Sequence, residues 1–494
     1  MAEDRSLRVL HVTSEMTPFV KAGGLGDVLG ALPKALRRDG VDARALIPAI
    51  PGVMERAEAE GFTLKKLPGT LNVALDWRVY SANVWRAEAS DGVKMPIYLL
   101  GQDELYTNPS IYPDILSHES VLPFVFLSLA ALELPAFLGW KPQILHVHDW
   151  PTAILPVALK HHHYYKSMAQ GYDVILTVHN PAHQGIIDPG ILAGWGLEDE
   201  AFSLDGLEFY GQANLLKGGL LAADAITTVS PHYSWDIQTQ DGGFGLHGVF
   251  SSSRHKLTGI LNGIDYDVWN PRKDRYLPSG FDAKDLSGKA LCRAKLLDIA
   301  GMPDDGKPLM TFVGRLVPQK GIDILLPALD WSLVDNCRMV LVGSGLQQYE
   351  EMVHEFRRSY PEHFWCFTEF SEELAHLAYA GSDVLVMPSL FEPCGLSQMI
   401  SMAYGTIPIV RGTGGLADSV IDFDASGDGT GFIFSDYNSD ELCQAMYRAF
   451  DVFSDHNRWS QVVQNAMRAD FSWTTSAKAY IDLYQNLRNG DSLT

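Results

Sequence analysis

A short glycine-rich segment near the amino terminus could bind a charged ligand. Residues 21–31 read Lys-Ala-Gly-Gly-Leu-Gly-Asp-Val-Leu-Gly-Ala and come soon after the apolar run at 9–12. Glycines such as Gly23 and Gly24 let a turn bring its backbone N–H groups close to a ligand. The helix expected after the turn adds the positive end of its dipole, and Lys21 adds a full charge. The segment therefore predicts an anion site that suits a diphosphate.

A dinucleotide-binding turn is the first alternative for this segment. Such a turn reads Gly-x-Gly-x-x-Gly and is followed by an acidic residue about 20 positions later. Here Leu29 stands where the third glycine belongs, and the strand-like run at 43–47 ends without an acid. Both features count against an NAD-dependent oxidoreductase, which would show an absorbance change at the nicotinamide band.

Charged and imidazole side chains also follow several other predicted strands. The carboxyl ends of parallel strands meet at one edge of a sheet, where ligands bind in open α/β folds. Arg315 and Lys320 would form a phosphate clamp with Lys21, because an arginine fork binds two oxygens and lysines act as point charges. The glycine turn at Thr413, Gly414 and Gly415 would add backbone donors. The candidates after these strands are Asp149, His179, Arg315, Lys320, Glu392 and Thr413.

Asp149, Glu392 and His179 indicate chemistry on a sugar. A carboxylate accepts hydrogen bonds from hydroxyls or stabilises an oxocarbenium-like centre. Asp149 lies two residues before Pro151 and Glu392 directly before Pro393, so helix capping competes with this interpretation. For His179 the alternative is a structural histidine at a strand end.

The elements that position these residues alternate between short apolar strands and helical stretches, which is typical of a parallel α/β fold. The turn-rich segment 261–272 predicts a hinge between two halves. Two doubly wound domains place their ligand in the cleft between them. The predicted strands span 8–14, 43–48, 95–100, 143–148, 173–179 and 225–229, then 309–315, 338–343, 364–368, 383–387 and 407–411.

Composition narrows the class of protein. The chain has 494 residues, of which 46% are hydrophobic, and this is enough for two or more cored domains. Its formal net charge of −22 argues against nucleic acid and anionic membranes as partners. Five scattered cysteines without a Cys-x-x-Cys pair predict reduced thiols and a cytoplasmic location. The apolar stretch 121–138 is interrupted by Ser128, Glu133 and Pro135, so we expect a buried helix there.

The motifs together resemble those of bacterial glycogen synthases and plant starch synthases, in family order from residue 8 to about 475. The glycine segment matches the Lys-x-Gly-Gly-Leu-x-Asp-Val signature of that family. The other matching segments are Val178-His179-Asn180, Leu215–Gly219, Thr227–Pro231, Leu261–Asp265, Gly314–Gly321, Phe391–Leu396 and Arg411–Asp418.

This resemblance implies a GT-B fold, with two Rossmann-like doubly wound domains that face each other across a cleft. The implied domains are 1–260, a hinge at 261–272, 273–472 for the nucleotide sugar, and a final helix at 473–494 that returns to the first domain. The implied reaction is transfer of glucose from ADP-glucose to the non-reducing end of an α-1,4-glucan, with retention and without a cofactor or metal.

The resemblance also assigns roles to individual positions. His179, Asp149 and Glu392 surround the reaction centre, and Lys21, Arg315 and Lys320 bind the diphosphate. The other residues implied to bind the nucleotide sugar are Gly23, Gly24, Asn262, Cys394, Gly395, Leu396, Thr413, Gly414 and Gly415.

Two other functions stay open at this point. A UDP-sugar donor has the same phosphates, so the clamp does not separate it from ADP. A non-catalytic glucan- or nucleotide-binding protein could share the scaffold, although a pure binder need not keep His179 and Glu392. Two loops also depart from the family's usual wording: residues 180–183 read Asn-Pro-Ala-His, and residues 242–245 read Gly-Gly-Phe-Gly.

Overall fold

The computed structural model describes residues 6–75, 77–90, 92–330, 336–369, 371–423 and 427–491. The chain forms two compact units, one made of Met1–Gly263 with Trp473–Thr494 and the other of Ile264–Ser472. The chain passes between the units at Gly263 and Ile264, inside the segment predicted as a hinge. Each unit is described by itself below.

The first unit is built on a ten-stranded sheet with the order β13-β12-β8-β7-β1-β2-β6-β5-β3, in which β4 also pairs with β5. A run of parallel strands from β13 to β6 forms its centre. All six strands predicted for the first half fall there, as β1, β2, β6, β7, β8 and β12, whereas β13 was not predicted. The strands are β1 (Arg8–Val12), β2 (Asp42–Pro48), β3 (Phe62–Lys66), β4 (Leu71–Leu75), β5 (Arg78–Ala89), β6 (Ile97–Gly101), β7 (Ile144–His148), β8 (Asp173–Val178), β12 (Ala225–Thr228) and β13 (Leu257–Gly259).

The antiparallel part of this sheet was not predicted. Strands β3, β4 and β5 pair antiparallel at one end of the sheet, and β5 pairs antiparallel with β6. Residues of β4 and of the first part of β5 alternate between buried and more exposed positions, as expected where one face meets solvent. A small separate sheet has the order β10-β11-β9, with β9 (Ile186–Ile187), β10 (Glu208–Phe209) and β11 (Gln212–Asn214).

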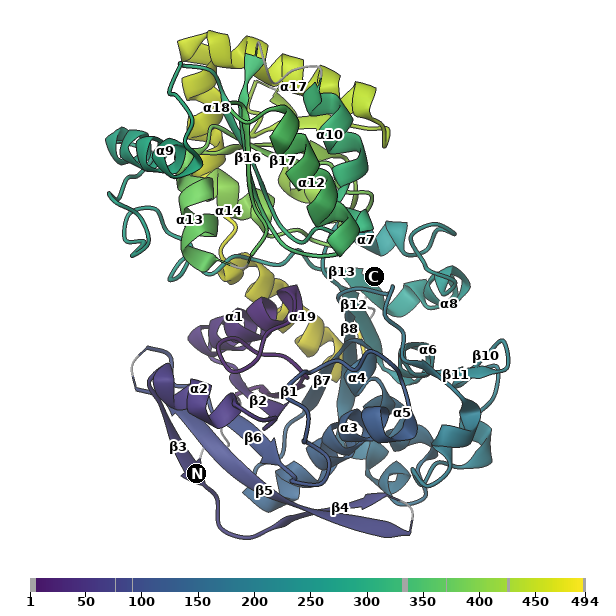
Figure 1. The fold of residues 1–494 in the computed structure, drawn as a ribbon. Helices are drawn as coiled ribbons and strands as arrows, with labels where there is room; N and C mark the ends of the chain where they lie inside the picture. The colour runs from purple at the N-terminus through teal and green to yellow at the C-terminus, as the bar shows by residue number, and fades with distance from the viewer. Residues whose placement is uncertain are drawn as a thin grey trace. The chain divides into compact units, whose positions relative to one another are not determined.

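Helices cover the sheet of the first unit (Figure 1). The α-helices are α1 (Gly24–Arg38), α2 (Val53–Ala59), α3 (His118–Leu138), α4 (Asp149–Thr152), α5 (Ile154–His161), α6 (Leu215–Ala222), α7 (Pro231–Asp236), α8 (His247–Ser252) and α19 (Trp473–Asn489). The short 3-10 helices are η1 (Tyr165–Gly171), η2 (Pro189–Leu192), η3 (Asp199–Ala201) and η4 (Arg254–Lys256).

Helix α3 fits the buried helix that the sequence predicts. Within the described residues it is the one helix long and apolar enough to cross a membrane by length and composition. Of its most apolar window, 72% is buried inside the unit. A core helix passes the same test, so length and composition alone carry no membrane assignment.

The last helix, α19, packs within the first unit. The Tyr484 hydroxyl lies 2.8 Å from His146 Nδ1 on β7, and Arg488 pairs with Asp173 at 2.6 Å. The Ser476 hydroxyl donates to the carbonyl of Leu261 at 2.5 Å. Tyr480 and Tyr484 are fully buried, so this helix completes the core beside α1.

The second unit is a doubly wound parallel sheet with the order β16-β15-β14-β17-β18-β19. Helices α10 and α12 lie on one side of the sheet, and α13 and α14 on the other (Figure 1). The reversal of strand order lies between β14 and β17, where ligands bind in such folds. The strands are β14 (Leu309–Val313), β15 (Arg338–Val342), β16 (Phe364–Phe367), β17 (Val384–Met387), β18 (Ile407–Arg411) and β19 (Phe432–Phe434).

All five strands predicted for the second unit are present, and β19 was missed. Central strands β15 and β17 are buried at every residue, as expected of parallel strands covered on both faces. The helices are α9 (Ser287–Ala300), α10 (Ile322–Asp330), α12 (Gln347–Ser359), α13 (Glu372–Gly381), α14 (Ser397–Ala403), α15 (Gly414–Ser419), α17 (Ser439–Ser454), α18 (His456–Arg468) and the 3-10 turn η5 (Pro318–Lys320).

Candidate active site

The glycine turn before α1 is already held by a carboxylate of the protein. Glu15 Oε2 accepts the N–H groups of Ala22 at 2.6 Å and Gly23 at 2.8 Å. The hydroxyl of Tyr112 donates to the other oxygen, Oε1, at 2.5 Å. Glu15 is 2% exposed. The sequence predicted that the Gly23 N–H would be open to a ligand. In the structure this N–H is bonded to Glu15, which fixes the turn.

Open space remains on the ligand side of this turn. A Cβ atom added to Gly23 or Gly24 would meet no atom within 4 Å. Gly24 is the first residue of α1, so its N–H belongs to the unsatisfied first turn of that helix. A phosphate oxygen can approach the backbone here without a steric barrier.

Lys21 is paired in the ligand-free structure. Its Nζ lies 2.7 Å from Asp27 Oδ1, and its side chain is half exposed. Burial raises the pKa of Asp27, and the Lys21 charge partly offsets that rise. Lys21 is thus oriented beside the turn by Asp27.

Asp149 is not a helix cap, which corrects the alternative interpretation from the sequence. It is the first residue of α4, with φ 53°, in the left-handed region that non-glycine residues seldom adopt. Its Oδ1 accepts the backbone N–H of His179 at 2.7 Å and lies 3.4 Å from that of Asn180. Burial raises the pKa of Asp149 to about 7. The carboxyl group therefore ties the end of β7 to the loop after β8.

Strand register places several histidines on one face of the first sheet. His11 on β1 pairs with His146 on β7, and His148 pairs with Thr177 on β8. Side chains two positions apart on a strand share a face, so His148 and His179 join this group. Desolvation lowers the pKa of His11 and His179 to about 3, and the pKa of His146 and His148 falls well below its usual value.

These histidines form hydrogen bonds with one another and with neighbouring side chains. His11 Nδ1 lies 3.3 Å from His148 Nε2, and His148 Nδ1 lies 3.1 Å from His179 Nε2. His146 Nδ1 faces the Tyr484 hydroxyl, and its Nε2 lies 2.6 Å from Thr177 Oγ1. Atoms of His11, His146 and His148 come within 4.8 Å of one another, a spacing that could hold a metal ion. A cation would have to displace these hydrogen bonds, so the donor set fits a hydrogen-bonded cluster better.

In the second unit, Lys320 and Glu392 form an ion pair. Lys320 Nζ lies 2.6 Å from Glu392 Oε2, and the Ser389 hydroxyl donates to the same oxygen at 3.0 Å. Their two loops are joined by Leu390 N–H donating to Gln319 O at 2.8 Å. The sequence predicted separate roles for Lys320 and Glu392, whereas the structure shows that their charges are coupled.

Arg315 has an exposed side chain and lies two residues after the end of β14. It is exposed, and its guanidinium has no hydrogen bond or ion pair to the residues that the structure describes. The backbone around it is fixed, because Leu316 N–H donates to Ser344 O at 2.8 Å. A rigid loop with an unpaired fork is well suited to an anionic ligand.

The predicted glycine turn after β18 offers fewer donors than expected. Thr413 N–H donates to Arg411 O at 2.9 Å, and Gly415 N–H donates to Glu392 O at 3.1 Å. The Gly415 bond braces the Glu392 loop and the Thr413 bond closes its own turn, so neither N–H group is free for a ligand. A Cβ at Gly415 would lie 2.1 Å from the Cys394 carbonyl oxygen, so only glycine fits this contact.

Of the remaining predicted residues, Cys394, Gly414 and Asn262 are buried, and Gly395 and Leu396 are half-buried. Cys394 is buried, and Gly395 adopts φ 72° just before Leu396, the residue that precedes α14. Gly414 begins α15 with φ 45°. Asn262, in the first unit, is 5% exposed, and its Oδ1 has no hydrogen-bond partner among the described residues. An unpaired buried amide oxygen is uncommon and marks Asn262 as a candidate ligand contact.

The structure thus collects the predicted residues in two sets. Asp149 and His179 meet in the first unit, and Lys320 and Glu392 meet in the second. The sequence reasoning missed Glu15, His11, His148 as a partner of His179, and Ser389. A usable signal existed for two of them, since a histidine inside an apolar strand and an acid before a glycine turn are both unusual.

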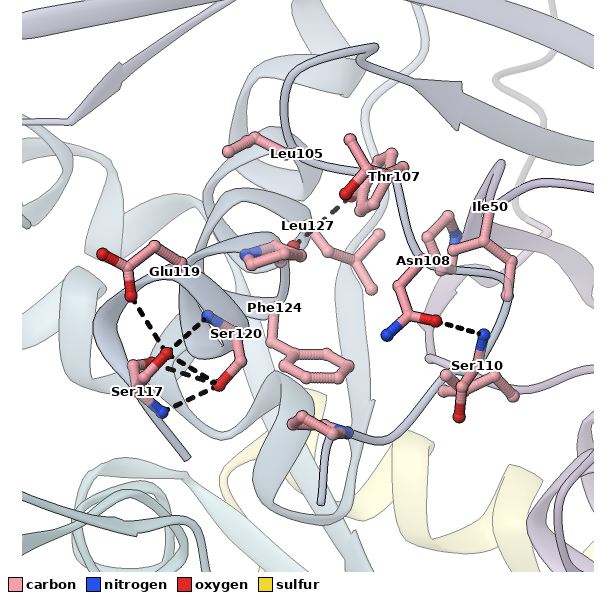
Figure 2. Close-up of a pocket in the computed structure, with 15 residues that line it drawn as sticks. Ile50, Leu105, Thr107, Asn108, Ser110, Ser117, Glu119, Ser120, Phe124 and Leu127 are labelled. Atoms are coloured by element: carbon pink, nitrogen blue, oxygen red, sulfur yellow. Dashed lines mark hydrogen bonds between the residues drawn. The ribbon is translucent and has the colours of Figure 1, made fainter. Parts of the chain in front are cut away.

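A separate cavity of about 250 Å³ lies in the first unit. Figure 2 shows it beside the start of α3, where Ser117 and Ser120 form the capping box of that helix. Its lining comes from residues between Pro48 and Leu127 and includes no predicted site residue. Tyr112, which bonds Glu15, lies in the same segment as its lining residues Ser110 and Ile111.

Comparison with known proteins defines the class. The family model described as the starch synthase catalytic domain matches residues 8–252, and that described as glycosyl transferases group 1 matches residues 300–465. The fold matches the catalytic domain of starch synthase IV from Arabidopsis thaliana, in complex with ADP and acarbose. That match has a TM-score of 0.90 and 32% identity, and covers 98% of this chain and 100% of that one. The protein is therefore a glycosyltransferase enzyme with a GT-B fold.

Curated relatives define the family. Glycogen synthase from Thermotoga maritima is 40% identical over 484 residues, which covers 97% of this chain and 98% of the relative. Glycogen synthase from Bacillus cereus is 38% identical, with 97% and 100% covered. The chain belongs to the glycogen synthase and starch synthase family, whose members transfer glucosyl units from a nucleotide-sugar donor to a glucan.

Proposed function

We propose that this enzyme transfers glucose from ADP-glucose to the non-reducing end of an α-1,4-glucan with retention of configuration. ADP as the nucleotide is supported by the starch synthase IV relative, which was solved with ADP and acarbose. Glycogen or a maltooligosaccharide is the proposed acceptor, in line with the glycogen synthase relatives.

The Lys320–Glu392 pair is the observation that carries this proposal. In a nucleotide sugar, the diphosphate is bonded directly to the anomeric carbon, so a cation that binds the phosphate and a carboxylate that acts on the sugar would lie close together. The two groups lie 2.6 Å apart and are only slightly exposed. When a donor binds, the diphosphate would take over Lys320, and Glu392 would be released to face the sugar.

Arg315 and Lys21 complete the proposed phosphate clamp. Arg315 is exposed and unpaired among the described residues, and Lys21 stands beside open space at Gly23 and Gly24. Charge-assisted bonds from an arginine fork contribute roughly 1.5–3 kcal/mol each. In a chain with a net charge of −22, such local cations are needed to hold an anion.

The loops around Glu392 have a supporting role in this proposal. Gly415 braces the Glu392 backbone, and Thr413 closes its own turn through Arg411 O. Gly414, Cys394, Gly395 and Leu396 would shape the adjoining surface. Asn262 is placed near the donor by the family resemblance, and its unpaired Oδ1 is covered by protein in the ligand-free structure. The backbone thus positions the Glu392 carboxylate, and few N–H groups are left to bind phosphate.

Glu392, His179 and Asp149 would act at the reacting sugar. The Glu392 carboxylate stabilises positive charge as the bond from glucose to phosphate breaks. His179 faces the sugar from the first unit, and Asp149 fixes the backbone of His179. We assign no protein nucleophile, and retention is satisfied when the acceptor hydroxyl arrives on the face that the phosphate leaves.

A cytoplasmic location is part of the same proposal. All five cysteines, each within the described residues, are free and buried. Free thiols support a reducing compartment.

A transfer assay tests the proposed donor and acceptor. The purified chain would be incubated with radiolabelled ADP-glucose or UDP-glucose and glycogen, and label in the precipitated glucan would be counted. We expect ADP-glucose to give the higher rate. Digestion with β-amylase, which removes maltose from non-reducing ends, should release the label. Faster transfer from UDP-glucose, or no label in the glucan, would overturn the proposal.

A further inference from the structure

The hydrogen-bond chain from His11 through His148 to His179 has two ends of different character. At the buried end, His11 Nε2 is sealed from solvent and has no hydrogen-bond partner among the described residues. At the other end, His179 retains 9% of its surface exposed. Its Nδ1 has no partner among those residues and, unlike His11 Nε2, is not sealed from solvent.

We propose that His11 and His148 are positioning residues that hold His179 in the tautomer with its proton on Nδ1. The proposed function gives His179 its place at the sugar, and this inference adds which hydrogen-bonding group the ring presents there. The group is a donor, so it would bind a sugar hydroxyl oxygen as acceptor.

The direction of the chain follows from counting protons. A neutral imidazole carries one N–H and one lone pair. If His148 donates from Nδ1, its Nε2 must accept from His11 Nδ1–H, and His11 Nε2 is left with an unused lone pair. If the chain runs the other way, His11 Nε2 becomes a buried N–H without an acceptor.

The first arrangement is favoured because buried N–H groups without acceptors are rare. Leaving such a donor unsatisfied costs enough to favour the alternative by roughly 5- to 150-fold. Neutral rings are expected throughout, since burial lowers the pKa of His11 and of His179 to about 3.

His146 packs against the hydrogen-bonded histidines but does not compete for their hydrogen bonds. Its ring stacks on His148 with centroids 4.3 Å apart. Both of its nitrogens are engaged elsewhere, with the Tyr484 and Thr177 hydroxyls. His146 therefore fixes the plane of the His148 ring, while both nitrogens of His148 stay committed to His11 and His179.

Nitrogen-15 NMR of the ligand-free protein, labelled in histidine, tests the tautomer directly. The His179 resonances would be assigned from their loss in the His179→Gln variant. We expect a protonated Nδ1 and an unprotonated Nε2 near neutral pH. A proton on Nε2, or a charged ring, would overturn the proposal. So would a shift of the His11, His146 and His148 signals on adding Zn²⁺, because that would identify a metal site.

A matched pair of variants tests whether His11 sets the tautomer. His11→Asn keeps an amide N–H near the Nδ1 position, whereas His11→Phe keeps a ring without a donor. We expect kcat for glucosyl transfer to fall about five- to tenfold in His11→Phe, the worth of one neutral hydrogen bond, and to be largely restored in His11→Asn. Equal losses in both variants, with an unchanged His179 spectrum, would overturn the proposal.

The two tests separate this inference from the proposed function. If the wild-type spectrum shows the Nδ1–H tautomer but no glucan synthesis is detected, the proposed function is contradicted and the role of His11 and His148 in setting the tautomer stands. If glucan synthesis is normal and His179 carries its proton on Nε2, the proposal that His11 and His148 set the tautomer is contradicted and the proposed function stands.

Discussion

Lys320 and Glu392 neutralise each other in the ligand-free second unit, so each depends on the other for stability. The side chains are 18% and 9% exposed, which leaves little water to solvate either charge alone. Breaking a buried pair by removing one partner destabilises a protein more than removing both.

We therefore predict that Lys320→Ala lowers the free energy of unfolding by about 2–4 kcal/mol. The double variant Lys320→Ala/Glu392→Gln should lose less than the sum of the single losses, because no uncompensated charge remains. Denaturant unfolding measures both, with the exposed Lys284→Ala in the same unit as the control. Simple additivity would show that the two charges are independent.

Asp149 should make stability depend on pH. Its pKa of about 7 lies above the ordinary value of 3.8, so between these pH values the folded state holds a proton that the unfolded state has released. The unfolded state then binds fewer protons, and the contribution of Asp149 to stability falls as pH rises through this window.

Asp149→Asn removes this titration while keeping the acceptor oxygen, and asparagine tolerates a left-handed backbone. We predict that the variant gains roughly 1–3 kcal/mol relative to wild type between pH 4 and pH 8. Thermal melts of both proteins across that range measure the difference in stability between variant and wild type. The buried histidines have the opposite pH dependence, but they are present in both proteins, so their effect cancels in this difference. Parallel curves for the two proteins would contradict the assigned pKa.

At the scale of elements, different residues of the turn before α1 stabilise the fold and face the proposed ligand. Glu15 holds the Ala22 and Gly23 N–H groups, so the turn is formed before a ligand arrives. Gly24 contributes no contact that a methyl group would disturb.

Gly24→Ala should therefore leave the melting temperature unchanged or slightly higher, because alanine favours the helix by roughly 0.5–1 kcal/mol. Affinity for ADP should fall at least tenfold, since the new Cβ would stand where the diphosphate approaches the backbone. Calorimetry with ADP gives the affinity, and Gly248→Ala, also free of contacts within 4 Å, is the control. Unchanged ADP affinity would exclude Gly24 from the binding surface.

Parallel strands were predictable because burial on both faces makes them continuous apolar runs. Strands β14, β15, β17 and β18 all lie at the predicted places. The antiparallel strands β3–β5 were not predictable in this way, because their pattern alternates and their short turns resemble other polar segments. The five-residue strand β3 has no buried residue.

At the scale of the whole molecule, the site motifs were predictable and their pairings were not. Lys320 and Glu392 were both identified, but 72 residues separate them and no local pattern couples them. His146 and Tyr484 are 338 residues apart, and only the packing of α19 on the first sheet joins them. Register decided the histidine cluster, because a one-residue shift would turn these rings to the other face.

We propose that donor binding draws the two units together through the segment between them. Lys21 belongs to one unit and Arg315 and Lys320 to the other, so a diphosphate bound by all three would tie both units to one ligand. Small-angle scattering should show a smaller radius of gyration with ADP plus a maltooligosaccharide than without ligand. Superimposable profiles at saturating ligand would count against closure.

The central claim is that phosphate binding and sugar chemistry are carried by different residues of one site. Arg315 is the clean probe of the phosphate side, because its exposed guanidinium has no partner among the described residues and its removal leaves no unpaired charge. Glu392→Gln probes the sugar side, because it keeps the shape of the side chain and removes the charge.

The most direct test is to measure kcat for glucosyl transfer and Kd for ADP in Arg315→Ala and Glu392→Gln side by side. Arg315→Ala should weaken ADP binding by about 1.5–3 kcal/mol, roughly 10- to 150-fold. Glu392→Gln should lower kcat by about 10²–10³ without weakening ADP binding, because the loss of the carboxylate leaves Lys320 free for the diphosphate. If ADP affinity collapsed in Glu392→Gln, or Arg315→Ala bound ADP as wild type does, the assigned division of roles would be contradicted.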